Sequence, residues 1–176
     1  SRDGGDRRPA APPPPLAPPG RAASAGLARA ESDLLRSLLA APAYIAQARE
    51  AVSPDDLEDP VARSLLSHLY TLPVSENPLR PADLVPLLEH DPALDQEGVD
   101  RRLSELVLAK DAEPLTPELF AHTLQYFRTR REKAELQALR RSIKQRIGTD
   151  IGYDDPEYLR LRELEQKLQN GQMKGT

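Results

Sequence analysis

Leucines recur at helical spacing from Leu27 onward. The segment Glu31-Ser-Asp-Leu-Leu-Arg-Ser-Leu-Leu places leucines at relative positions i, i+1, i+4 and i+5, and Leu27 precedes them on the same side. This spacing predicts an amphipathic helix with a broad apolar face. Pro42 is expected either to stop this helix or to open the next one in its first turn.

Two helix starts follow, each marked by a capping residue before a proline. Ser53-Pro54 is followed by two aspartates, and Asp59-Pro60 repeats the signal. Side-chain oxygens at such positions accept hydrogen bonds from the free N–H groups of the first turn. The second helix is expected to end at Pro73 and to bury an apolar stripe made of Val61, Leu65, Leu66, Leu69 and Leu72.

Two shorter helices are expected before residue 109. One covers Asp83–Leu88, with Pro86 in its first turn, where a missing N–H costs nothing. The other follows Gly98 and presents Val99, Leu103, Leu106 and Val107. No run of four to eight β-branched residues occurs, so the expected fold class is all-α. The expected architecture is a bundle of about five to six helices over residues 25–131, then a long helix leading into a C-terminal antiparallel helical hairpin.

The last third of the chain contains that long helix. Thr116-Pro117 is a start signal, and no breaker follows until Gly148, which predicts about 31 helical residues, or about 46 Å. Its first half is expected to pack on the bundle through Leu119, Phe120, Leu124 and Phe127. Its second half carries a narrower stripe of Leu136, Leu139, Ile143 and Ile147.

Pro156 opens a final helix, and the hairpin is assigned to residues 132–176. The stripe of this helix consists of Tyr158, Leu161, Leu164 and Leu168. A single seam of about eight side chains barely offsets the ordering entropy of the two helices, so apolar surface should remain for a partner to cover. Ile151 and Tyr153 in the connecting loop support a docking arm. The alternative is that the hairpin folds back on the body by charge attraction.

Charge is unevenly distributed. The net charge is −4 overall, but residues 25–116 carry −9 and residues 117–147 carry +5. An acidic body disfavours general nucleic-acid binding, which requires a broad cationic surface. The basic run around residues 128–146 contains few aromatics for base stacking, and Glu132 and Glu135 lower its potential. Direct nucleic-acid binding is therefore not expected, and a protein partner is favoured.

The first 24 residues are expected to form a disordered interdomain linker. Seven of the 18 prolines lie between Pro9 and Pro19, and such a segment cannot bury enough apolar area to fold. A PxxP ligand for an SH3-like domain is a weaker alternative. Because the chain opens with Ser1, we expect it to be a fragment of a longer protein.

Residues with catalytic potential do not form a recognisable motif. The sequence contains no cysteine, no phosphate-binding glycine loop and no H-E-x-x-H, and the three histidines, His68, His90 and His122, are far apart. Paired aspartates occur at helix starts, where capping explains them. We therefore expect a non-catalytic chain without a metal site or a cofactor. No run of about 18 apolar residues and no secretion signal is present, so membrane association is not expected.

The order of these helices resembles the C-terminal domain of bacterial DnaG-type DNA primases. Glu31 to Pro42 is similar to that family's opening helix, which runs E-x-x-LL-x-x-LL-x-x-P. Pro60 to Tyr70 is similar to its third helical block, and Glu118 onward to its long helix and terminal hairpin. The resemblance covers about residues 27–170. The N-terminal domain of the replicative helicase has a related fold and is the alternative within this resemblance. In the helicase, however, the linker follows that domain, whereas here the proline-rich segment precedes it.

The resemblance implies a protein-interaction domain that binds the N-terminal domains of the hexameric, DnaB-type replicative helicase. Such binding recruits primase to the replication fork and stimulates the helicase. The parent chain would be a primase in the bacterial cytoplasm, and this part of it would be a monomer when alone. A helical nucleic-acid-binding adaptor is the alternative of another class. Carried over by position, the partner-binding residues are Ile143, Lys144, Arg146, Ile147, Ile151, Tyr153, Tyr158, Leu161, Arg162, Glu165 and Leu168.

Overall fold

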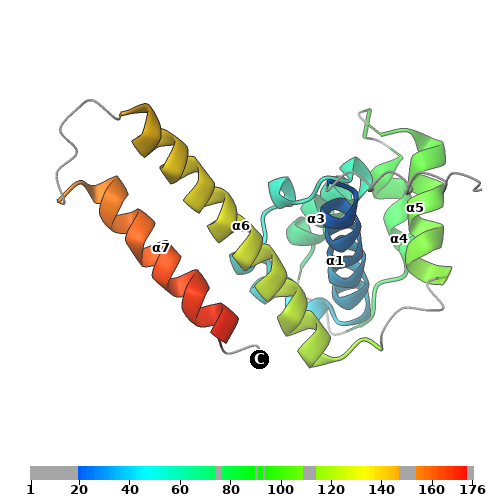
Figure 1. The fold of residues 1–176 in the computed structure, drawn as a ribbon. Helices are drawn as coiled ribbons and strands as arrows, with labels where there is room; N and C mark the ends of the chain where they lie inside the picture. The colour runs from blue at the N-terminus through cyan, green and yellow to red at the C-terminus, as the bar shows by residue number, and fades with distance from the viewer. Residues whose placement is uncertain are drawn as a thin grey trace, which may run out of the picture.

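A computed structural model describes residues 20–73, 77–89, 91–92, 94–108, 114–146 and 154–173. Within these ranges every regular element is a helix, which confirms the all-α fold class (Figure 1). The elements are α1 (Gly20–Ala40), the 3-10 helix η1 (Pro42–Tyr44), α2 (Ile45–Ala51), the 3-10 helix η2 (Pro54–Asp56), α3 (Pro60–Thr71), α4 (Pro81–Leu88), α5 (Gln96–Leu108), α6 (Pro117–Gln145) and α7 (Pro156–Met173).

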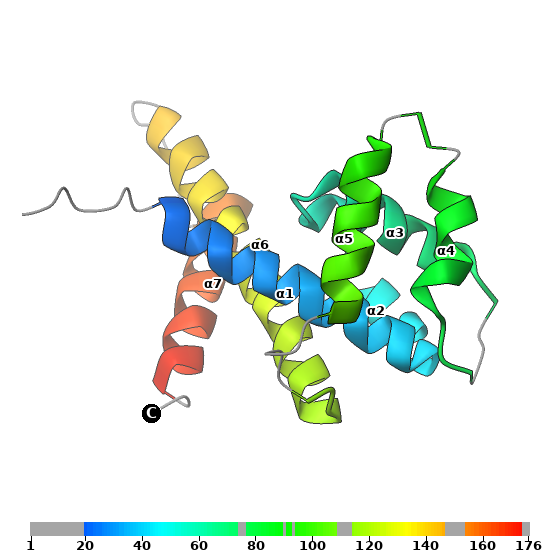
Figure 2. The ribbon, with the colours of Figure 1, turned by 90° about the vertical axis from the view of Figure 1, so that its right-hand side faces the viewer.

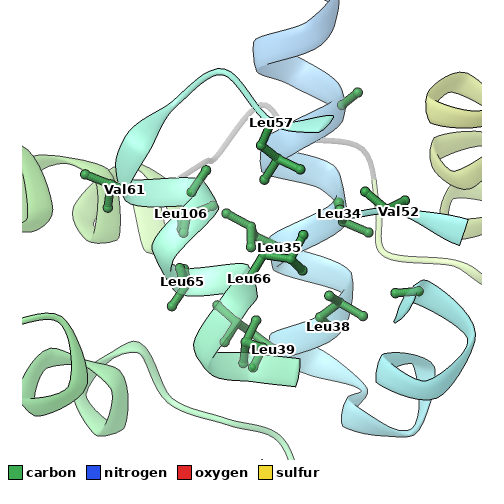
Figure 3. Close-up of a cluster of buried hydrophobic side chains, with 14 of the residues drawn as sticks. Leu34, Leu35, Leu38, Leu39, Val52, Leu57, Val61, Leu65, Leu66 and Leu106 are labelled. Carbon is green, nitrogen blue, oxygen red and sulfur yellow. The ribbon is translucent and has the colours of Figure 1, made fainter. Parts of the chain in front are cut away.

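We call the part of the structure formed by α1 to α5 the body, and helix α1 lies at its centre. Leu34, Leu35 and Leu38 are completely buried among residues of α3 that include Leu65 and Leu66 (Figure 3). The predicted apolar face of α1 is therefore confirmed. The helix begins at Gly20, so residues 20–24, which the sequence assigned to the linker, are helical. Residues 1–19, the rest of that segment, lie outside the described ranges.

The predicted capping signals are used as expected. Pro42 opens η1 at its first position, which is one of the two roles considered for it. Asp56 Oδ2 accepts a hydrogen bond from the Ser53 backbone N–H at 2.7 Å, and the Ser53 side chain caps η2 in return. Asp59 Oδ1 accepts from the Val61 N–H at 3.1 Å and starts α3. These bonds satisfy N–H groups that have no partner inside a helix.

Two details of the shorter helices differ from the sequence prediction. Helix α4 begins at Pro81, so Pro86 is its sixth residue and not part of its first turn. Without an N–H, Pro86 cannot donate to the Ala82 carbonyl. Helix α5 begins at Gln96, two residues before Gly98. Val107 is 61% exposed because it lies about 80° around α5 from the buried Val99, at the edge of the contact surface.

A charged cluster joins three segments of the body. The carboxylate of Glu31 in α1 is buried and accepts a hydrogen bond from the Glu58 N–H at 2.6 Å. Arg102 of α5 lies 4.0 Å from Glu31 and forms an ion pair with Asp59 at 2.7 Å. Because a buried carboxylate without partners is costly, this cluster fixes α1, α5 and the start of α3 relative to one another.

Helix α6 extends from the body into a second layer of structure. Its first turn is capped by Thr116, whose Oγ1 accepts from the Leu119 N–H at 3.1 Å. Its 29 residues correspond to about 43 Å, close to the predicted length. Phe120, Leu124 and Phe127 are buried in the main core, as predicted, and Leu119 is half-buried. Tyr44 stacks on Phe120 with 4.4 Å between ring centroids.

Because α6 packs into the main core, replacing one of its buried side chains by alanine should greatly lower the stability of the fold. Phe127 is 1% exposed and Leu159 of α7 is 55% exposed. Phe127→Ala should lower the free energy of unfolding by about 3–5 kcal/mol, because it leaves a cavity in the main core. Leu159→Ala should change it by less than about 0.5 kcal/mol. Urea denaturation followed by circular dichroism measures both, and equal effects of the two variants would contradict the assigned core.

Candidate functional site

The candidate site is the pair of helices α6 and α7, which we call the arm. Helix α7 runs antiparallel along the second half of α6, on the side of α6 opposite to α1 (Figures 1 and 2). The main core takes side chains from the first half of α6, up to Phe127. The arm is thus attached to the body through one continuous helix.

Apolar side chains along the α6–α7 seam form a separate small cluster. Leu164 is 1% exposed and Leu136 is 9% exposed, and neither belongs to the main core. The other stripe residues that the structure describes are only half-buried: Leu139, Ile143, Tyr158, Leu161 and Leu168. Because two helices share one seam, these side chains keep part of their surface in contact with solvent. This is the incomplete burial that the sequence pattern predicted.

Ion pairs fix the register between the two helices. Glu135 pairs with Arg160, whose Nε lies 2.8 Å from the carboxylate. Arg140 pairs with Glu165 at 2.7 Å. A further pair joins Glu132 and Lys167. Each pair is largely exposed and contributes little on its own, but the series crosses the seam at successive positions and specifies one alignment.

A denser set of polar contacts joins the ends of the two helices that are adjacent along the chain. The Arg146 guanidinium lies 2.6 Å from Asp155 and 3.0 Å from Glu157. The Ser142 hydroxyl donates to Glu157 at 3.0 Å. Asp155 also accepts from the backbone N–H of Glu157 at 2.9 Å and so caps the start of α7. The start of α7 is therefore fixed to the end of α6.

These contacts shift the protonation equilibria of two carboxyl groups. The hydrogen bond from Arg160 lowers the pKa of Glu135, and the hydrogen bond from Arg146 lowers the pKa of Asp155. A lowered carboxyl pKa in the folded state adds stability above the unfolded-state pKa of about 4. That contribution is lost as the pH falls through the folded-state pKa. The packing of α7 against α6 should therefore become less stable in acid.

Two arginines in the middle of α6 connect the arm to the acidic body. Arg130 donates to the Asp56 carbonyl at 2.9 Å and pairs with Glu58 at 2.7 Å. Arg131 pairs with the Asp56 carboxylate. The attraction between the basic stretch and the acidic body, which was considered as an alternative for the hairpin, is present at Arg130 and Arg131, while α7 itself lies on the other side of α6.

The structure gives the carried-over site residues three different environments. Ile143, Tyr158, Leu161 and Leu168 are half-buried along the seam. Arg146 and Glu165 are engaged in ion pairs between the two helices. Lys144 and Arg162 are exposed. Ile147, Ile151 and Tyr153 lie outside the described residues.

Leu159 of α7 is exposed and was not among the residues expected at the site. At 55% exposure it lies outside the seam, on the same outer side of α7 as Arg162. The available signal was its position directly after Tyr158, which places it out of phase with the apolar stripe of this helix.

Other classes of site find little support in the described residues. His, Asp and Glu side chains do not gather there in groups of three or more that could hold a metal ion. No helix in these ranges is long and apolar enough to span a membrane. Comparison with protein-family models, curated proteins and solved structures returned no match.

The α6–α7 register predicts a selective change in one pKa. Arg160→Gln should raise the pKa of Glu135 toward its ordinary value of 4.5, because the charged hydrogen bond is lost. Arg162→Gln, two residues away on the outer face, should leave the pKa of Glu135 unchanged. Carboxyl titration by NMR measures both variants. If the pKa of Glu135 is unchanged in the Arg160→Gln variant, the alignment of the two helices is contradicted.

Proposed function

We propose that this chain is a non-catalytic protein-docking domain that binds its partner through the arm. The observation that carries the proposal is the incomplete burial of α7. This helix packs along α6 on one side only, and the described stripe residues other than Leu136 and Leu164 remain partly exposed. Such a surface stabilises a complex when a partner removes the remaining apolar area from water.

The partner we propose is the N-terminal region of the hexameric replicative helicase. This choice rests on the resemblance of the helix order to the C-terminal domain of DnaG-type primases. In that family the terminal hairpin is the principal attachment to the helicase. The partly exposed seam of the arm is compatible with that role. The proposed consequences are recruitment of primase to the fork and stimulation of the helicase.

The outer face of α7 is the part of the arm that we assign to the interface. Leu159 is the exposed apolar residue there, and Arg162 is an exposed cation three residues later. Interfaces are typically centred on apolar or aromatic anchors, with charged groups at the rim. Seam residues such as Tyr158 add their exposed edges. Arg146 and Glu165 then act within the arm and hold α7 in place.

Docking is tested with the full chain and the helicase of its source bacterium. Size-exclusion chromatography with light scattering should show a mass equal to the hexamer plus bound domains. The double variant Leu159→Ser/Arg162→Glu should shift the apparent Kd upward by about tenfold or more, since it removes an anchor and reverses a rim charge.

The matched control is Val107→Ser/Arg101→Glu on α5. Val107 is as exposed as Leu159, and Arg101 is an exposed cation, so composition and charge change in the same way. This control should bind like the wild type. Absence of any complex with the wild-type chain would refute helicase docking, and equal loss in both variants would refute the assignment to α7. Circular dichroism verifies that each variant is folded.

A further inference from the structure

The second half of α6 has a solvent face from which all negative charge is absent. The carboxylates after the helix midpoint are Glu132 and Glu135, and both are directed to α7, where Lys167 and Arg160 neutralise them. These two glutamates therefore do not lower the positive potential of the solvent face, contrary to what the sequence suggested.

Three cations lie together on that face. Lys133, Arg141 and Lys144 are exposed and recur at spacings of eight and three residues, with the exposed Gln137 between them. At 100° per residue they fall within an arc of about 80°, which is centred about 125° from the seam residues and about 90° from the mean direction of the buried Phe120, Thr123, Leu124 and Phe127, which pack on the body. We call Lys133, Gln137, Arg141 and Lys144 the basic strip.

The charges of the basic strip are not used inside the described part of the chain. Arg141 makes one long hydrogen bond, from its Nε to the Gln137 carbonyl at 3.4 Å, which leaves its charge unpaired. Neither Lys133 nor Lys144 forms an ion pair with a described residue. By contrast, Arg130, Arg131, Arg140 and Arg146 of the same helix are all paired with carboxylates. The exposed Arg128 also forms no ion pair with a described residue, but it lies on the opposite side of α6, about 180° from the centre of the basic strip.

The chemistry of the basic strip selects a polyanion without apolar character. None of its four residues has an apolar side chain, so it has no anchor for the dry centre that a protein interface requires. Lysine, arginine and glutamine are side chains that contact phosphate oxygens. Lys133 and Lys144 are separated by about 16 Å along the helix axis, the axial length of about five phosphates of one duplex strand.

We propose that the basic strip binds the phosphate backbone of a nucleic acid without sequence preference. The four residues of the strip include no aromatic side chain, so the strip itself contacts phosphates and not base faces, and the exposed Tyr126 lies about 10 Å before Lys133 along the helix axis. This surface lies on α6, whereas the docking surface proposed above lies on the outer face of α7. The two proposals are therefore independent, and a chain that engages a protein through α7 would have the basic strip available for a nucleic-acid strand.

Fluorescence anisotropy with labelled oligonucleotides tests the proposal on the full chain. The probes are oligo(dT) and a mixed-sequence duplex, both of about 20 nucleotides per strand, so that each exceeds the length of the strip. At physiological salt, about 150 mM, the Kd should lie in the range of non-specific binding, about 10⁻⁴ to 10⁻⁶ M, and it should fall as the salt is lowered. Three phosphate contacts predict a slope of log K against log salt of about −2 for the single strand and about −3 for the duplex.

A matched pair of triple variants separates the strip from overall charge. Lys133→Gln/Arg141→Gln/Lys144→Gln should weaken binding by about tenfold or more and flatten the salt slope. The control, Arg101→Gln/Arg128→Gln/Arg162→Gln, removes the same charge from exposed positions elsewhere and should retain binding. Circular dichroism and thermal melting verify that both variants fold.

Three outcomes would overturn the proposal. The first is no anisotropy change with either oligonucleotide at low salt, and the second is an equal loss of binding in both triple variants. The third is binding of polyglutamate in preference to both oligonucleotides, which would assign the strip to an acidic protein. Because helicase docking is measured by complex mass without nucleic acid and with variants that leave the basic strip intact, failure of one proposal leaves the other standing.

Discussion

The continuity of α6 is the constraint on which the rest of the architecture depends. One uninterrupted helix buries Phe120 and Phe127 in the main core and Leu136 in the seam with α7. A helix is stiff because each turn is hydrogen-bonded to the next, so the orientation of the arm is set where α6 meets the body. Arg130 and Arg131 add polar contacts at the transition between the two layers.

Charge is sorted around α6 according to what each side of the helix faces. Carboxylates on the seam side meet cations of α7, and arginines near the body meet Asp56 and Glu58. The net charge of +5 over residues 117–147 is therefore not a diffuse property of the segment. Its unpaired part is confined to positions that neither the body nor α7 covers. Sequence order alone cannot show this, since neighbouring residues such as Glu132 and Lys133 point in different directions.

Local signals in the sequence were sufficient to locate most helices. Capping at Asp59 and Thr116, and the leucine spacing of α1, depend on nearby residues, so they can be interpreted without tertiary information. The position of Pro86 in the second turn of α4 was not predictable in this way, because it depends on where that helix begins. The exposure of Val107 depends on how far α4 and its neighbours extend over α5.

The candidate site was predictable in outline and not in detail. Incomplete burial of the α6 and α7 stripes followed from having one seam for two helices. The roles of Arg146 and Glu165 did not, because ion pairing across the seam depends on the register between the helices. Leu159 was recognisable only as a residue out of phase with its stripe, and three of the expected site residues lie outside the described ranges.

The antiparallel attachment of α7 also determines how the arm responds to mechanical force. The cross-seam pairs are distributed along the helix, from Glu157 near its first turn to Lys167 near its other end. A pulling force parallel to the axes of α6 and α7 acts on all these ion pairs at once, so several of them must break together. Traction perpendicular to the axes at the C-terminal end of α7 peels them apart one at a time. The direction in which a moving partner pulls would therefore decide how firmly α7 stays attached.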